Sequence, residues 1–136
     1  IQDCTPQELV NTYDNSILYT DAMLDNTIKL LQQHNDRFNT ALVYLSDHGE
    51  SLGENGMYLH GTPYMFAPSQ QTHIPFLMWL SPEYTKNYGI DRQCLSDSAQ
   101  HDEISQDNLF HTILGMMNVQ TTEYQSGMDL LQKCRS

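Results

Sequence analysis

A long amphipathic helix near the start of the chain limits the fold more than any other feature. Thr5 is a favourable N-cap residue, Pro6 fits the first helical position, and Glu8 completes a capping box. A stripe of apolar residues at helical spacing then predicts a helix that ends near residues 34–35. The stripe comprises Val10, Tyr13, Ile17, Leu24, Ile28 and Leu31. About 28 residues rising roughly 1.5 Å each span some 42 Å. Such a helix is more natural beside a large sheet than in a free-standing small domain.

Two apolar runs predict the strands. Residues 40–45 read TALVYL and residues 74–80 read IPFLMWL. A continuous apolar run with β-branched members is typical of a strand that is buried on both faces. A helix followed by a buried strand indicates an α/β fold with a mainly parallel sheet. Two strands make a poor sheet alone, so we expect the last third of a larger α/β domain.

The remaining stretches give weaker signals. Residues 51–72 are rich in Gly and Pro and predict an extended loop, and residues 83–104 are polar and predict irregular structure. A last helix is expected to begin at the N-cap residue Ser105. Its expected buried residues are Leu109, Phe110, Ile113, Leu114 and Met117. A short helical turn is expected around residues 128–131.

Composition excludes several classes of partner. The 136 residues include 17 acidic and 6 basic ones, which gives a formal net charge of −11. Phosphate binding requires clustered Lys and Arg, so nucleic acid is excluded and an anionic membrane surface is disfavoured. No apolar run approaches the ~18–20 residues of a membrane span. The sequence has no P-loop or dinucleotide fingerprint.

The three cysteines leave two interpretations open. Cys4, Cys94 and Cys134 are far apart in the chain. They are either free thiols of a reducing compartment or, in an oxidising one, a Cys94–Cys134 bridge with Cys4 paired elsewhere. Closing a loop of roughly 40 residues would contribute about 4 kcal/mol.

The sharpest chemical feature follows the first strand. Asp47 and His48 come directly after residues 40–45, and His60 follows twelve residues after His48. Oxygen and imidazole ligands suit Zn²⁺, and α/β folds place ligands beyond the carboxyl ends of strands. Glu50 and Glu54 are further carboxylates nearby. The simpler interpretation is a polar turn with an exposed histidine, and two ligands would not complete a zinc site.

Other residues admit ordinary explanations. His73 flanks the second strand and is close enough in sequence to reach the same crevice, although a structural role is the simpler view. His101 and His111 are expected at the surface or in packing. An apolar loop near His60 either packs in a core or lines a lipid-facing pocket. The loop contains Tyr58, Tyr64, Met65 and Phe66.

An extended block of sequence surrounds Asp47, His48 and His60. Residues 46–56 read SDHGESLGENG, residues 58–61 read YLHG, and Pro63 and Tyr64 follow. The flanking segments include NTYDN at residues 11–15 and SQDNLF at residues 105–110. Together these segments resemble the phosphoethanolamine transferases of Gram-negative bacteria, which modify lipid A and include the mobile colistin resistance proteins. The shorter SDHGE core is shared across the alkaline phosphatase and sulfatase superfamily.

The resemblance implies a fold and a location. The expected fold is an alkaline-phosphatase-like three-layer α/β sandwich with a mainly parallel sheet. Residues 1–136 would form the C-terminal portion of its periplasmic catalytic domain. A membrane domain and the rest of the catalytic domain would precede it, at the periplasmic face of the bacterial inner membrane. That compartment favours the disulfide, with Cys4 paired upstream.

The resemblance also implies an activity, in which phosphoethanolamine passes from phosphatidylethanolamine to lipid A and confers polymyxin resistance. Asp47 and His48 match zinc ligands, and His60 matches a histidine that binds a second zinc or the phosphoethanolamine group. Glu50 is expected beside the substrate. The threonine nucleophile is expected upstream, so the isolated chain would be inactive. The alternatives are a sulfatase or phosphoglycerol transferase of the same superfamily, or a non-catalytic fragment.

Overall fold

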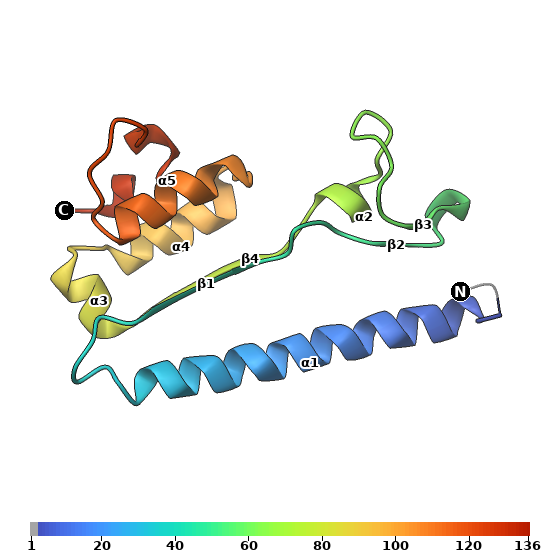
Figure 1. The fold of residues 1–136 in the computed structure, drawn as a ribbon, viewed down its shortest axis with the longest axis horizontal. Helices are drawn as coiled ribbons and strands as arrows, with labels where there is room; N and C mark the ends of the chain where they lie inside the picture. Colours follow the sequence, from blue (N-terminus) through green and yellow to red (C-terminus); the bar gives the residue numbers. More distant parts are fainter. Residues whose placement is uncertain (1–2) are drawn as a thin grey trace. The chain divides into compact units, whose positions relative to one another are not determined.

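The computed structural model describes residues 3–136, which divide into two compact units at residues 80 and 81. The first unit contains α1 (Pro6–Gln32), β1 (Ala41–Leu45), β2 (Ser51–Leu52), η1 (Glu54–Gly56), β3 (Tyr58–Leu59), α2 (Ser69–Thr72) and β4 (Phe76–Leu80). The second contains α3 (Pro82–Asn87), α4 (Arg92–His101), α5 (Asp107–Met116), η2 (Ser126–Met128) and η3 (Gln132–Cys134). Figure 1 shows these elements in sequence colours.

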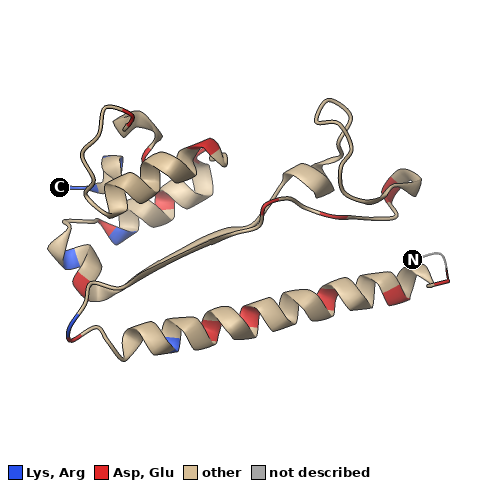
Figure 2. Cartoon of the chain, viewed as in Figure 1, with Lys and Arg blue, Asp and Glu red and all other residues tan. Residues whose placement is uncertain are grey.

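The capping residues fix the start of α1 as predicted. The Thr5 hydroxyl accepts a hydrogen bond from the Glu8 N–H, and the Glu8 carboxylate accepts one from the Thr5 N–H at 2.8 Å. The hydrogen bond from the Thr5 N–H holds the pKa of the Glu8 carboxyl below its usual value. The helix ends at Gln32, two residues earlier than expected. Acidic side chains are spaced along it, and its one basic side chain is Lys29 near the C-terminal end (Figure 2).

The apolar face of α1 is less covered than predicted. None of its residues is buried, and Ile17 in the predicted stripe is 48% exposed. Further apolar side chains lie exposed at Leu18, Tyr19, Met23 and Leu30. The helix therefore carries more apolar surface than the described residues cover. No helix among residues 3–136 has the length and apolar character that a membrane crossing needs.

The two predicted strands pair with each other in a two-stranded sheet. β1 and β4 are antiparallel, with Ala41 opposite Leu80 and Leu45 opposite Phe76. A mainly parallel sheet was expected because helix and strand alternate in the sequence, and the described residues form only antiparallel pairs. The second pair, β2 with β3, is also antiparallel. All five β1 residues are half-buried, not fully buried as expected.

Two predicted irregular segments contain regular structure. Residues 51–72 hold the β2–β3 hairpin, η1 and α2, and residues 83–104 hold most of α3 and all of α4. The overlooked signals are N-caps. The Ser81 hydroxyl accepts from the Tyr84 N–H, and the Asp91 carboxylate accepts from the N–H groups of Gln93 and Cys94. His101 is thus the last residue of α4, not part of a loop.

The second unit packs its C-terminal tail against a polar face of α5. α5 begins two residues after Ser105, whose hydroxyl accepts from the Asp107 N–H. Its buried residues are Thr112, Gly115 and Met116, whereas the predicted Phe110, Ile113 and Met117 are exposed. This part of the prediction is wrong because the C-terminal tail packs along the face of α5 that carries Asn108, Thr112 and Gly115. Asn108 donates to the Met128 carbonyl, and the Thr112 hydroxyl accepts from the Leu130 N–H.

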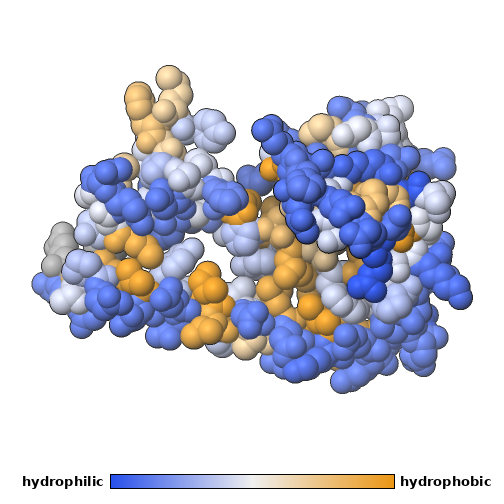
Figure 3. Space-filling view, turned by 180° about the vertical axis from the view of Figure 1, so that it is seen from behind, coloured by the Kyte–Doolittle hydropathy of each residue, from blue (hydrophilic) through white to orange (hydrophobic). Residues whose placement is uncertain are grey.

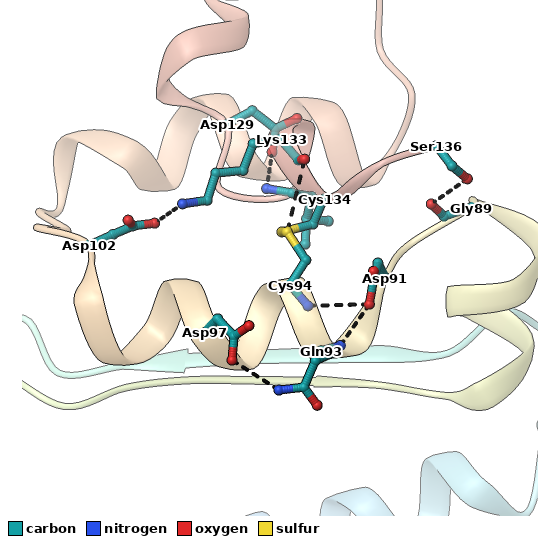
Figure 4. Close-up of a disulfide and its surroundings, with 11 residues drawn as sticks. Gly89, Asp91, Gln93, Cys94, Asp97, Asp102, Asp129, Lys133, Cys134 and Ser136 are labelled. Atoms are coloured by element: carbon teal, nitrogen blue, oxygen red, sulfur yellow. Dashed lines mark hydrogen bonds and ion pairs between the residues drawn. A yellow bond between two sulfur atoms is a disulfide. The ribbon is translucent and has the colours of Figure 1, made fainter.

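A disulfide closes this unit, as the oxidising alternative predicted. Cys94 of α4 is bonded to Cys134 of η3, and the two Cα atoms are 5.5 Å apart (Figure 4). Asp91 caps α4 beside it, and its N–H donates to the Cys134 carbonyl at 2.8 Å. Lys133 pairs with Asp102 at the end of α4. Cys4 is an exposed free thiol, so its expected upstream partner stays a prediction.

Candidate metal centre

Three predicted site residues converge at the end of β1. His48, Glu50 and His60 each offer a ligand atom, and these atoms lie within 4.8 Å of one another. The imidazole rings of His48 and His60 stack with centroids 3.8 Å apart. Two histidines and a carboxylate form a donor set that suits Zn²⁺ or a similar divalent ion.

The β2–β3 hairpin brings His60 back to Glu50. Ser51 pairs with Leu59, so the residues just outside this pair, Glu50 and His60, lie opposite each other. Glu50 Oε2 lies 3.1 Å from His60 Nδ1. The hairpin has only two residue pairs, and Leu59 adopts a φ of 66° as the chain leaves it. The hairpin thereby brings Glu50 and His60, which are ten residues apart in the sequence, into direct contact.

Both histidines are oriented through the same ring nitrogen. His48 Nδ1 lies 2.9 Å from the Gly49 carbonyl, and His60 Nδ1 faces the Glu50 carboxylate. A carbonyl or carboxylate oxygen that accepts a hydrogen bond from Nδ1–H leaves Nε2 as the lone-pair nitrogen of each ring. Metal-binding histidines are commonly held in this way.

Asp47 lies beside this group. Its Oδ1 accepts a hydrogen bond from the His48 N–H at 3.0 Å, and its Oδ2 lies 3.8 Å from His48 Nε2. Two bonds of roughly 2.0–2.2 Å to one ion can span a gap of up to about 4 Å. The separation of the Asp47 and His48 atoms is compatible with a shared metal ion, although Asp47 is not in the three-residue group.

Glu50 provides the clearest sign of a missing partner. Its side chain is 23% exposed, and its Oε1 is buried without a hydrogen-bond partner. Buried carboxylate oxygens are normally paired or bound to a metal ion. The site residues thus fit a divalent metal. Glu54 is used differently, since its Oε2 accepts from the Leu52 N–H.

The backbone packs closely around the site. Gly49 donates its N–H to the Gln71 carbonyl at 2.9 Å, and a Cβ at Gly49 would lie 2.0 Å from the Gln70 carbonyl oxygen. Only glycine permits this approach between the site segment and α2. Gln71, which the sequence did not single out, is 6% exposed and bonds to Ser51 and Thr62. His73 caps the end of α2 and is not part of the metal group.

The apolar loop near His60 is exposed. Tyr64, Met65 and Phe66 are 87%, 87% and 73% exposed, at a turn where Phe66 N–H donates to the Pro63 carbonyl. Apolar side chains lie at the tip of this projecting loop in Figure 3. A small cavity near Glu50 is lined by Leu9, Glu50, Ser51, Leu52, Tyr58 and Leu59. Tyr58 belongs to this cavity, not to the tip of the loop.

Comparison with known proteins places this site in a family. The sulfatase family profile matches residues 2–119. The chain therefore belongs to the sulfatase family, whose members use metal-dependent sites. Within that family, its sequence groups with phosphoethanolamine transferases of the EptA and Mcr type.

Two curated relatives carry that closer assignment. Phosphoethanolamine transferase EptA of Escherichia coli K12 is 56% identical over 135 residues, which cover 99% of this chain and 25% of the relative. Phosphatidylethanolamine transferase Mcr-1 of Escherichia coli is 42% identical over 102 residues, which cover 75% of this chain and 18% of the relative. The chain thus spans about a quarter of the length of the first relative.

Two solved structures agree with the fold. The soluble domain of lipooligosaccharide phosphoethanolamine transferase A from Neisseria meningitidis matches with a TM-score of 0.95 and 48% identity. The match covers 99% of this chain and 40% of that one. The C-terminal periplasmic domain of phosphoethanolamine transferase EptC from Campylobacter jejuni matches with a TM-score of 0.82 and 49% identity, over 96% of this chain and 40% of that one. The chain is homologous to part of a periplasmic transferase domain.

Proposed function

We propose that this chain supplies part of the metal and substrate site of a zinc-dependent transferase. The enzyme would move phosphoethanolamine from phosphatidylethanolamine to lipid A at the periplasmic face of the inner membrane and confer polymyxin resistance. Residues 1–136 would be the C-terminal portion of its catalytic domain, with the threonine nucleophile in the part outside this chain. The convergence of His48, Glu50 and His60 within 4.8 Å supports this proposal most directly.

Each site residue has a role that follows from its position. Asp47 and His48 would hold the metal, because Oδ2 and Nε2 lie 3.8 Å apart. Glu50 orients His60 through Nδ1 and so directs Nε2 of His60 toward the metal or the substrate phosphate. A bound zinc ion would offset the charge of the transferring phosphoryl group and lower the pKa of a coordinated hydroxyl.

The surroundings suit a lipid substrate. The exposed Tyr64, Met65 and Phe66 follow His60 by four to six residues and offer an apolar surface close in sequence to the polar site. An acyl chain and a phosphate headgroup require that combination. A net charge of −11 disfavours a free polyanion such as nucleic acid, and a metal centre would attract phosphate locally.

The test replaces the two proposed ligands in the full-length protein. Asp47→Ala and His48→Ala are each expected to abolish zinc binding and transfer. Both are measured, zinc by calorimetric titration and transfer by mass analysis of lipid A from expressing cells. His34→Ala, which changes an exposed histidine after α1, is the matched control and should retain both.

Zinc binding and polymyxin resistance retained in the two ligand variants would contradict the proposal. Another added group on the substrate would favour the phosphoglycerol transferase or sulfatase alternative.

A further inference from the structure

Gln71 is the one buried residue of the short helix α2, and it contacts the site segments on two sides. It is 6% exposed, whereas its neighbours Ser69, Gln70 and Thr72 are exposed. A long polar side chain is seldom buried unless its amide is hydrogen-bonded. The partners of this amide therefore indicate why it is buried.

Besides the bond from its own N–H to the Pro68 carbonyl, Gln71 makes three hydrogen bonds, two to residues 49–51 and one to Thr62. Its carbonyl accepts from the Gly49 N–H at 2.9 Å. Its side-chain Nε2 donates to the Ser51 hydroxyl at 2.8 Å, and its Oε1 accepts from the Thr62 N–H at 3.3 Å. Ser51 is itself only 1% exposed.

These partners flank the metal-binding side chains. Gly49 lies between His48 and Glu50, Ser51 follows Glu50, and Thr62 follows His60 by two residues. Gln71 thus joins the segment that carries His48 and Glu50 to the segment that carries His60. It does so without contacting the metal-binding atoms.

The hairpin alone holds His60 weakly. Only two residue pairs join β2 to β3, and a two-stranded hairpin is marginally stable by itself. Leu59 and Gly61 on either side of His60 both have positive φ, at 66° and 97°. The buried Gln71 amide adds a fixed connection just beyond this irregular backbone.

We propose that Gln71 is a positioning residue that sets the separation between His48, Glu50 and His60 and so determines metal affinity. The inference rests on the proposed function, because it assumes that zinc binds at His48 and His60 and that Glu50 orients His60. Gln71 acts through the backbone at Gly49 and Thr62 and is not itself a ligand. Partners that orient metal ligands typically change metal affinity about 10–100-fold when they are replaced.

The test compares three variants of the full-length protein. Gln71→Met keeps the length of the side chain and removes both amide hydrogen bonds. Ser51→Ala removes only the oxygen that Gln71 Nε2 contacts, so it perturbs folding least. Gln70→Met changes the exposed neighbour on the same helix and is the matched control. Metal-free protein is titrated with ZnCl₂ alone in a calorimeter, and activity is followed as a function of added Zn²⁺.

Gln71→Met is expected to weaken Zn²⁺ binding about tenfold or more. Ser51→Ala should weaken Zn²⁺ binding by a smaller factor, and Gln70→Met should leave the affinity unchanged. The double variant Gln71→Met/Ser51→Ala should be no worse than Gln71→Met alone, because one hydrogen bond is shared. The activity of Gln71→Met should need more Zn²⁺ but reach the wild-type plateau, which general unfolding would not produce.

The outcomes separate the two proposals. Wild-type Zn²⁺ affinity in both Gln71→Met and Ser51→Ala would overturn the role of Gln71 and leave the proposed function intact. A Gln71→Met plateau that stays low at saturating Zn²⁺ would also overturn it. Failure of the wild-type protein to bind Zn²⁺ would instead overturn the proposed function and, with it, this inference.

Discussion

At the scale of single residues, Gly49 shows how closely the site segment approaches α2. We expect Gly49→Ala to destabilise the protein and weaken zinc binding, because the new Cβ would lie 2.0 Å from the backbone oxygen of Gln70. Overpacking typically costs about 1–3 kcal/mol, and a backbone contact cannot move aside as a flexible side chain would.

Denaturant unfolding and zinc titration measure the effect of Gly49→Ala. Gly127→Ala is the matched control, since no atom lies within 4 Å of a Cβ there. Equal stability and zinc affinity in the two variants would show that the approach of Gly49 to α2 is not required.

Tyr84 makes stability depend on alkaline pH. It is 4% exposed, and its hydroxyl donates to the Met116 carbonyl at 2.7 Å. Burial raises its pKa from 10.0 to about 12, and the nearby Tyr88 adds to the rise. The folded state holds the proton more tightly, so its contribution is complete below pH 10 and is lost as pH rises from 10 to 12.

Tyr84→Phe should remove both the hydrogen bond and this pH dependence. The expected loss is about 1 kcal/mol at neutral pH, and the absorbance titration near pH 12 should lose one tyrosine. Tyr64→Phe, at an 87% exposed position, is the control. An unchanged alkaline titration in Tyr84→Phe would contradict the assignment.

The sequence allowed candidate ligands to be named, but not the residues that hold them in place. Asp47, His48 and His60 combine ligand chemistry with a position just after a strand, and both properties can be read from the sequence. Gln71 carries no such signal, because a glutamine in a polar loop is ordinary. Its burial depends on a backbone approach between Gly49 and α2 that only the three-dimensional structure contains.

At the scale of elements, α5 illustrates why an apolar pattern can mislead. Its most apolar face includes Phe110 and Met117, and both are exposed. The buried face instead meets a polar tail, where the Asp129 carboxylate lies against Gly115 and accepts from the Tyr124 hydroxyl at 2.7 Å. Hydrogen bonds between residues about twenty positions apart in the sequence determine which face of α5 is buried. The periodicity of apolar residues does not reveal such bonds.

The disulfide is the strongest link between elements of the second unit. Removing it by Cys94→Ser is expected to lower the free energy of unfolding by about 4 kcal/mol, because the bond closes a loop of some 40 residues. Cys134→Ser and the double variant should lose the same amount, since each change removes the same bond. Chemical denaturation measures all three. Additive losses would show that the two thiols act through separate contacts.

At the scale of the whole molecule, burial is uneven between the two units. In the described part of the chain, five of the six buried apolar residues belong to residues 81–136, namely Tyr84, Ile90, Met116, Leu131 and Cys134. The exception, Leu80, ends β4. The first unit holds the site and the long helix, but little of its apolar surface is fully buried.

The length of the relatives accounts for this asymmetry. The chain matches 40% of a solved soluble domain with a TM-score of 0.95, and in a domain of that size the exposed apolar side chains would have further neighbours. The length of α1 correctly indicated such a domain. The sequence order could not give the direction of the β1–β4 pair, because the long connection over residues 46–75 allows either a parallel or an antiparallel pair.

We therefore predict that the isolated 136-residue chain exchanges its backbone amides unevenly. Local opening requires less free energy where few apolar side chains are buried. Amides of β1, β4 and α1 should exchange at least about tenfold faster than those of α4 and α5, which a disulfide and a buried tail restrain. Hydrogen exchange followed by mass spectrometry measures both sets.

In the full-length protein, α1 should become as protected as α5, because its exposed Leu18, Tyr19 and Leu30 would gain neighbours. Equal exchange of the two units in the isolated chain would show that residues 1–80 fold stably on the contacts described here.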